Sequence, residues 1–256
     1  MDWLNGLERW RGRVALVTGA TSGIGAATAR ALAQCGMNVA LAGRRTERLE
    51  AMEAELRALG VEARGFRTDM RDEAQVRELF RQTMSHFGGL DVLINNAGLG
   101  TKGPIAETPL EDLREILDVN VLAMTQCMQE ALKAMQGRPE GAILTVSSML
   151  GHVVPPNRGV AMYSASKHAV RAVMEGLRGE LAAAGRPIKL CMLSPGLTAT
   201  EFQQVADRSG SGGSSFFGDY KVLDADDVAE MALYMLATPP HVQVNEIFMR
   251  PMGQPH

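Results

Sequence analysis

Aromatic residues are scarce in this chain of 256 residues, where Phe, Tyr and Trp together make up 5% of the sequence. Basic residues are not in excess either, because 26 lysines and arginines stand against 29 aspartates and glutamates, for a net charge of -3. Proteins that bind nucleic acid or anionic membranes usually carry an excess of positive charge. The overall charge therefore predicts neither kind of partner.

Long apolar runs are also missing, and none approaches the roughly 20 residues of a membrane-spanning helix. The N-terminus, Met-Asp-Trp-Leu-Asn-Gly-Leu-Glu, has neither the basic start nor the apolar stretch of a signal peptide. These absences predict a cytoplasmic protein with no membrane partner.

Cysteine and histidine are few and dispersed. The three cysteines, Cys35, Cys127 and Cys191, are far apart in the sequence, and the five histidines form no group with metal-ligand spacing. We expect the cysteines to pack as small apolar side chains in a reducing compartment, and we expect no metal site.

What the sequence does contain is a regular alternation of short apolar runs with helical segments. The apolar runs predict strands at residues 14–17, 37–42, 61–67, 90–94, 142–146, 188–193 and 246–249. The segments between them predict helices at residues 26–34, 46–59, 72–87, 108–135, 162–184 and 226–236. This pattern predicts an α/β fold with a parallel, doubly wound sheet of seven strands flanked by helices on both faces.

No linker, repeat or change in composition interrupts that alternation, so we expect a single domain spanning residues 1–256. Residues 1–12 form an amphipathic lead whose Trp3, Leu7 and Trp10 can pack on the body of the domain.

A glycine-rich turn follows the first predicted strand. It reads Thr18-Gly19-Ala20-Thr21-Ser22-Gly23-Ile24-Gly25 and opens the first helix. Glycines at such a turn let the backbone approach a pyrophosphate, and the helix N-terminus attracts the anion. A tight turn without a ligand would need similar residues, but the strand–loop–helix context favours a dinucleotide site.

The second strand ends at Gly43-Arg44-Arg45, where many dinucleotide sites have an acid for the ribose hydroxyls. Arginine instead suits a 2′-phosphate, because its planar fork binds phosphate through two hydrogen bonds. The pair favours NADP over NAD, although it could also be the solvated start of a helix.

Tyr163 and Lys167 stand four residues apart in the helix predicted over 162–184 and so share one of its faces. A cation beside a phenol lowers the pKa of the phenol, which suits it for proton transfer to an alcohol or carbonyl oxygen. Taken alone, this spacing far more often means a surface lysine beside a packed tyrosine, so the other motifs must decide.

The segment 201–222 is rich in Ser and Gly and also contains Phe202, Phe216, Phe217 and Tyr220. Aromatic residues in a flexible loop near strand ends favour a lid over an apolar substrate pocket. The composition is equally typical of a disordered surface loop.

The motifs occur in a fixed order: Thr18-Gly19-x-x-x-Gly23-x-Gly25, Asn95-Asn96-Ala97-Gly98, Asn120, Ser148, Tyr163-x-x-x-Lys167 and Pro195-Gly196. Together they resemble the short-chain dehydrogenase/reductase family over nearly the whole chain. The resemblance implies a Rossmann domain, and it is narrower to a branch with NADP-linked carbonyl reductases, farnesol and steroid dehydrogenases and 3-hydroxy acid dehydrogenases.

The resemblance also implies the role of each residue. Tyr163 is the general acid and base, and Lys167 lowers its pKa and binds the nicotinamide ribose. Ser148 holds the substrate oxygen, Asn120 positions a water, and Ser147 is structural. The cofactor residues implied are Gly19, Thr21, Ser22, Gly23, Ile24, Gly25, Arg44, Arg45, Asp69, Met70, Asn95, Ala97, Gly98, Tyr163, Lys167, Pro195, Gly196, Thr198 and Thr200.

These residues predict an oxidoreductase that transfers a hydride between NADP(H) and an apolar carbonyl or secondary alcohol substrate. The resemblance also implies a homo-oligomer, a dimer or tetramer. Residues such as Val121, Met124, Met128, Val170, Met174 and Leu177 could form its interface or be ordinary core. The alternative function is a non-catalytic NADP-binding sensor or scaffold that retained the fold.

Overall fold

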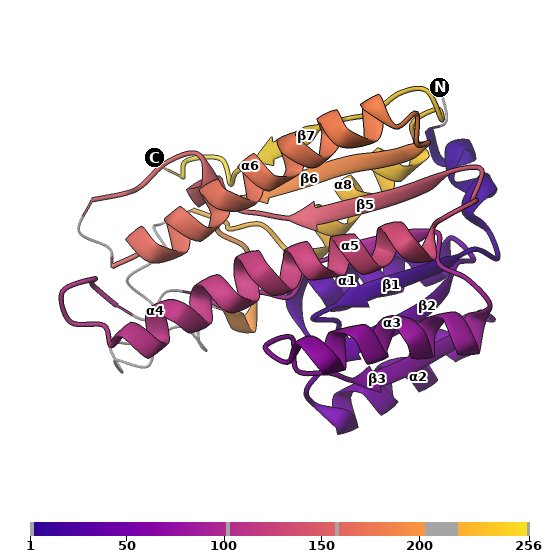
Figure 1. Ribbon diagram of the computed structural model, residues 1–256, viewed down its shortest axis with the longest axis horizontal. Coiled ribbons are helices and arrows are strands. Elements are labelled where there is room, and N and C mark those ends of the chain that lie inside the picture. Colours follow the sequence, from indigo (N-terminus) through magenta and orange to yellow (C-terminus); the bar gives the residue numbers. More distant parts are fainter. Residues whose placement is uncertain (1–2, 101–102, 157–158, 203–219, 255–256) are drawn as a thin grey trace.

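The computed structural model describes residues 3–100, 103–156, 159–202 and 220–254. Its centre is a parallel sheet of seven strands in the order β3-β2-β1-β4-β5-β6-β7 (Figure 1). The strands are β1 (Val14–Thr18), β2 (Asn38–Gly43), β3 (Ala63–Arg67), β4 (Val92–Asn95), β5 (Gly141–Val146), β6 (Ile188–Pro195) and β7 (Glu246–Met249).

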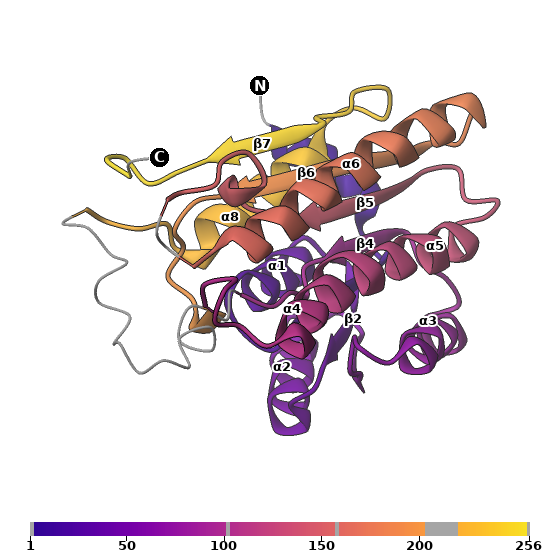
Figure 2. The same cartoon turned by 60° about the vertical axis from the view of Figure 1, so that its left-hand side comes forward.

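Helices cover both faces of this sheet, as the two views in Figures 1 and 2 show. Helices α1, α2 and α8 pack on one face, and α3, α5 and α6 pack on the other. The long helices are α1 (Gly23–Gln34), α2 (Thr46–Ala58), α3 (Glu73–Phe87), α4 (Leu110–Leu117), α5 (Met124–Ala134), α6 (Ala161–Ala183) and α8 (Ala225–Ala237). The predicted doubly wound α/β fold is therefore confirmed.

The central strands are buried along their whole length because helices cover both faces. Every residue of β1, β5 and β6 is buried. This explains why those strands read as continuous apolar runs rather than as alternating ones.

The helix predicted over residues 108–135 is not continuous. It begins at Leu110 with Pro109 at the N-cap, and a π-helical turn, η2 (Asp118–Ala123), separates α4 from α5. Thr108, at the expected start of the helix, lies before it and donates its hydroxyl to Pro104 O at 2.7 Å. Just after the π turn, the Asn95 Nδ2 donates to Met124 O at 2.8 Å, so that carbonyl has a partner from outside the helix.

The N-terminal lead packs on the body of the molecule as predicted. It forms a 3-10 helix, η1 (Trp3–Trp10), in which Leu7 and Trp10 are buried. The Trp10 Nε1 donates to Leu236 O at 3.0 Å, which ties the lead to the end of α8.

Four of the six apolar residues that could form an oligomer interface are core residues of this chain. Met124, Met128, Val170 and Met174 are at most 2% exposed and belong to the core on the α5 and α6 side of the sheet. Cys127 and Cys191 are buried as predicted, while Cys35 is only partly buried.

The strand order reverses between β1 and β4, because β2 and β3 lie on one side of this pair and β5 to β7 on the other. In open parallel sheets, ligands bind beyond the carboxyl ends of the strands at this switch point. Within the described ranges, no helix is long and apolar enough to cross a membrane, and no three metal-ligating side chains gather.

Candidate active site

Most of the predicted site residues follow the carboxyl ends of strands β1 to β6, which all lie at one edge of the parallel sheet. Helix α6 brings Tyr163 and Lys167 to the same edge. Tyr163 is 9% exposed and Lys167 is 3% exposed. The Lys167 Nζ lies 5.7 Å from the centre of the Tyr163 ring and donates to Val146 O at 3.0 Å. The two side chains are thus buried side by side against the end of β5.

Burial, rather than the neighbouring lysine, dominates the ionisation of the tyrosine. It raises the pKa of Tyr163 to about 12, and a hydrogen bond with the Ser148 side chain opposes that rise in part. Lys167 is not among the causes of this shift, so its expected lowering of the Tyr163 pKa stays a prediction. Lys167 is itself desolvated, because burial lowers the pKa of its ammonium to about 8. Tyr163 consequently keeps its proton near neutral pH, as a proton donor must.

Ser148 stands between β5 and the short 3-10 helix η3 (Met149–Gly151), and its Oγ accepts from Leu150 N at 3.1 Å. The end of this turn is fastened to β7, because the His152 Nε2 lies 2.5 Å from Glu246 Oε1. Ser194 on β6 donates to the same carboxylate oxygen at 2.5 Å. The turn that follows Ser148 is therefore tied to Glu246 of β7, which also bonds Ser194 of β6. The buried Ser147 Oγ, expected to be structural, has no partner among the described residues.

Asn120 lies on the π turn and is fully buried. Its Oδ1 accepts from Leu99 N at 2.7 Å, and its Nδ2 donates to Leu99 O at 2.9 Å and to Ser166 Oγ at 3.0 Å. Both amide protons are therefore used within the protein. A Cβ built on Gly98 would lie 3.3 Å from Asn120 Oδ1 and 3.9 Å from Lys167 Nζ. Asn120 and Lys167 thus meet at the backbone of the Asn95–Gly98 turn.

The Asn96 side chain bonds the backbone at the start of the glycine loop. Its Nδ2 donates to Thr18 O at 2.9 Å and to Gly19 O at 3.2 Å. A Cβ built on Gly25 would lie 2.4 Å from this nitrogen, so no larger residue fits there. Gly19 and Gly23 have φ of 66° and 52°, a conformation that favours glycine. The loop therefore brings partly exposed backbone to the N-terminus of α1, which fits the pyrophosphate of a dinucleotide.

The two arginines after β2 have different surroundings. Arg45 donates to Thr21 Oγ1 at 2.8 Å and to Ser22 Oγ at 2.7 Å, and it pairs with Glu201 at 2.9 Å. Arg44 is exposed and makes no hydrogen bond or ion pair with the described residues. Arg44 is therefore the arginine of this pair with its guanidinium available to a phosphate.

Three other predicted cofactor residues contact the rest of the fold. Asp69 pairs with Arg71, which lowers the pKa of that carboxyl, and Arg71 also bonds Glu115 at 2.8 Å. The Asn95 side chain is 1% exposed and bonds α5, so only its backbone could reach a cofactor. Met70 is partly buried against the core.

The segment after β6 lies along the glycine loop. The Thr200 side chain is close to Gly23, where a Cβ would come within 2.9 Å of it. Thr198 is buried and donates to Gly196 O at 3.1 Å, and Leu197 N donates to Gln254 Oε1 at 3.0 Å. This segment therefore connects the loop end of the site to the end near Tyr163.

Two described residues of the predicted lid reach the site, Glu201 at Arg45 and Phe202 at Tyr163. The Phe202 ring lies 5.8 Å from the Tyr163 ring, and 37% of Phe202 is exposed. Phe216 and Phe217 lie outside the described residues.

Sequence reasoning missed four residues that shape the site: Asn96, Ser166, Glu201 and Gln254. Only Asn96 had a local signal, since it stands next to Asn95 in the quoted motif. The partners of the others are distant in the sequence or depend on which way a side chain points.

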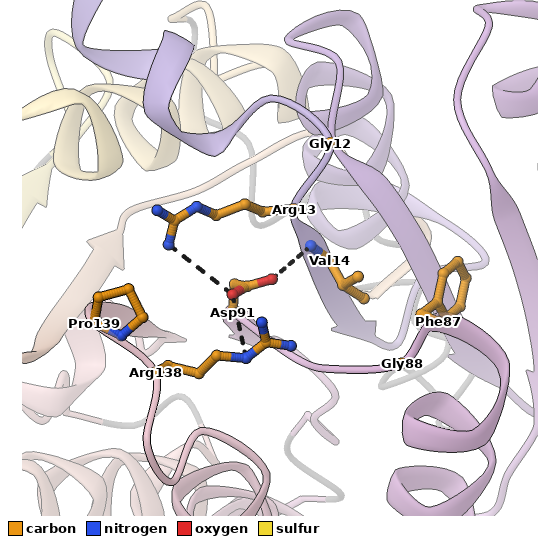
Figure 3. A pocket seen from close by; sticks show the side chains of 8 residues that line it. All are labelled: Gly12, Arg13, Val14, Phe87, Gly88, Asp91, Arg138 and Pro139. Atoms are coloured by element: carbon orange, nitrogen blue, oxygen red, sulfur yellow. Dashed lines mark hydrogen bonds and ion pairs between the residues drawn. The ribbon is translucent and has the colours of Figure 1, made fainter.

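A separate pocket lies at the opposite edge of the sheet, where β1 and β4 begin (Figure 3). Arg13 and Arg138 both point to the buried Asp91, at 4.0 Å and 3.6 Å, and Asp91 Oδ2 accepts from Val14 N at 3.0 Å. Both arginines of this pocket therefore pair with Asp91, a carboxylate of the same chain.

The profile of the short chain dehydrogenase family matches residues 13–209. The chain belongs to the short-chain dehydrogenase family. It is 40% identical over 254 residues to dehydrogenase/reductase SDR family member 11 of Mus musculus, covering 97% of this chain and 98% of that protein. It is also 39% identical to the farnesol dehydrogenase of Aedes aegypti, covering 97% of this chain and 99% of the relative.

Solved structures agree with this short-chain dehydrogenase assignment. A short-chain dehydrogenase from Burkholderia cenocepacia in complex with NADP has a TM-score of 0.83 at 33% identity, covering 94% of this chain and 97% of that one. A Burkholderia phymatum member in complex with NAD has a TM-score of 0.82 at 28% identity, covering 93% and 89%. The family thus uses a nicotinamide cofactor and includes complexes with either form.

Proposed function

We propose that this short-chain dehydrogenase is an NADP(H)-dependent carbonyl reductase or alcohol dehydrogenase. The observation that carries the proposal is the burial of Tyr163, Lys167 and Ser148 together at the carboxyl ends of the strands, with Asn120 adjoining through Gly98. Such a group suits a reaction that needs one proton donor and one clamp for an oxygen atom.

In the reductive direction, the Tyr163 hydroxyl donates its proton to the substrate oxygen, and in the oxidative direction the phenolate takes it back. The raised pKa of Tyr163 keeps that proton in place until the oxygen becomes basic. Ser148 holds the same oxygen by a second hydrogen bond. A bound nicotinamide would supply or accept the hydride at the carbonyl carbon.

Lys167 supplies positive charge close to the forming phenolate, and its Nζ would also bind the nicotinamide ribose. We infer that Asn120 supports a water near Lys167 through its backbone or the free lone pair of Oδ1, because both protons of its amide are taken. The glycine loop from Gly19 to Gly25 would hold the pyrophosphate.

The preference for NADP rests on Arg44. Its exposed guanidinium follows β2 and bonds no described residue, so it is free to bind a 2′-phosphate. We infer an apolar substrate from Phe202 beside Tyr163 and from Leu150, Val153 and Val154 after Ser148. The likeness to a farnesol dehydrogenase is compatible with such a substrate.

We also infer a homo-oligomer, because Leu110 and Leu122 are 60% and 62% exposed on the outer side of the α4–α5 segment. Light scattering on the purified protein tests this, and a monomer at micromolar concentration would contradict it.

The proposed reaction is tested by incubating the protein with NADPH and a panel of apolar ketones and aldehydes. We expect NADPH absorbance to fall and the matching alcohols to appear. Binding of NADPH without turnover of any carbonyl or alcohol would favour the non-catalytic sensor instead.

A further inference from the structure

An ion cluster joins helix α2 to the segment after β6, next to the glycine loop. Glu201 accepts from the Arg45 Nη1 at 2.9 Å through Oε2, and from the Arg48 Nη1 at 2.8 Å through both carboxylate oxygens. The two guanidiniums lower the pKa of the Glu201 carboxyl. Glu201 is therefore a carboxylate anion that neutralises part of the positive charge of this region near neutral pH.

The same guanidinium of Arg45 also lies on the glycine loop. Its Nε donates to Thr21 Oγ1 at 3.1 Å, and its Nη2 donates to Thr21 Oγ1 and to Ser22 Oγ. All three nitrogens of Arg45 are consequently engaged, with Nη1 directed at Glu201. A carboxylate here makes the charge-assisted bonds that arginine otherwise makes to a phosphate.

We propose that Glu201 is a specificity-determining residue of the nucleotide site, which occupies Arg45 and Arg48 and thereby reduces the advantage of a 2′-phosphorylated cofactor. The inference rests on the proposed function, since it assumes that the loop and Arg44 hold the adenosine end of NADP. Glu201 and the 2′-phosphate are both anions drawn to one arginine cluster, so they compete for it and repel each other.

Glu201 could also have the opposite effect on cofactor binding, and the two roles can be told apart by experiment. If Glu201 instead acted as a clamp that closes the site over any dinucleotide, removing its charge would loosen Arg45 and weaken NADP and NAD alike. The two roles therefore predict changes of opposite sign for NADP.

The test is titration calorimetry of the purified protein with NADP⁺ and with NAD⁺, which needs no turnover. The variant is Glu201→Gln, which keeps the size of the side chain and removes its charge. Because these pairs are about 40% exposed and exposed ion pairs are weak, we expect NADP⁺ to bind about three- to tenfold more tightly. NAD⁺ affinity should stay within about twofold, because NAD⁺ has no 2′-phosphate for Glu201 to repel and exposed substitutions usually have small effects.

The matched control is Glu47→Gln. Glu47 is an exposed carboxylate in the first turn of α2 and has no ion pair with Arg45 or Arg48. It makes the same change in net charge close to Arg44, and it should leave the ratio of the two affinities nearly unchanged.

An equal gain in both variants would attribute the effect to net charge and overturn the role of Glu201. Unchanged NADP⁺ binding, or weaker binding of both dinucleotides, in Glu201→Gln would also overturn it. If the wild-type protein bound neither dinucleotide, the proposed function itself would fall, and the inference with it.

Discussion

Replacing Lys167 by methionine should abolish turnover and yet make the folded protein more stable near pH 7. Methionine has nearly the length of lysine and no charge to desolvate. Burial lowers the pKa of Lys167 from 10.5 to about 8. At ~1.4 kcal/mol for each pH unit, keeping this ammonium charged in the folded state costs about 3 kcal/mol.

Part of that gain is lost, because the variant leaves Val146 O without the hydrogen bond from Nζ at 3.0 Å. An unpaired buried carbonyl costs about 1–3 kcal/mol. We therefore expect the free energy of unfolding of Lys167→Met to exceed that of the wild type by up to ~2 kcal/mol near pH 7.

The difference should depend on pH. Between pH 8 and 10.5, the unfolded wild-type chain binds more protons at Lys167 than the folded protein does. The free energy of unfolding of the wild type therefore rises with pH across that window, and the advantage of the variant shrinks. Lys189, whose pKa burial also lowers to about 8, is present in both proteins, so its contribution cancels.

The assay is urea denaturation followed by circular dichroism, for both proteins near pH 7 and near pH 10. A variant less stable than the wild type near pH 7 would refute the reasoning. So would a difference in stability that is the same at both pH values.

Three further predictions concern positions that shape the site. Ser166→Ala removes the Oγ that accepts from Asn120 Nδ2, and leaving this buried N–H without that acceptor costs about 1–3 kcal/mol. We expect kcat to fall about tenfold while the KM for NADPH is unchanged, and an unchanged kcat would contradict this. Arg44→Ala should reduce the preference for NADPH over NADH in kcat/KM by about tenfold or more, the worth of a charge-assisted phosphate contact, and equal losses with both cofactors would argue against this role. Gly25→Ala should lower the free energy of unfolding by about 1–3 kcal/mol and weaken NADPH binding, because the new Cβ would lie 2.4 Å from Asn96 Nδ2. A variant as stable in urea as the wild type would contradict this predicted clash.

The fold could be predicted because its signals are local. Each buried strand reads as a short apolar run, and each helix carries an apolar stripe, so their alternation indicates a doubly wound sheet. The π turn at Asn120 had no such signal. The Asn95 side chain bonds the Met124 carbonyl beside this turn, and periodicity cannot report a contact between residues so far apart in the sequence.

As with the fold, the features of the candidate site that depend on local spacing could be predicted from the sequence. Spacing placed Tyr163 beside Lys167 because a helix sets that distance, and both are buried together in the structure. Spacing could not give the direction of the pKa of Tyr163, because that depends on how far burial outweighs a cation. The partnership of Arg45 with Glu201 joins residues 156 positions apart and likewise left no local pattern.

The central claim is that Tyr163 donates the proton in carbonyl reduction. The most direct test is the kcat/KM of Tyr163→Phe with NADPH and a carbonyl that the wild type reduces, together with NADPH binding by calorimetry. We expect kcat/KM to fall by about a hundred- to ten-thousandfold, the usual worth of a positioned acid, while the affinity for NADPH stays near that of the wild type. Turnover by Tyr163→Phe at the wild-type rate would contradict the claim.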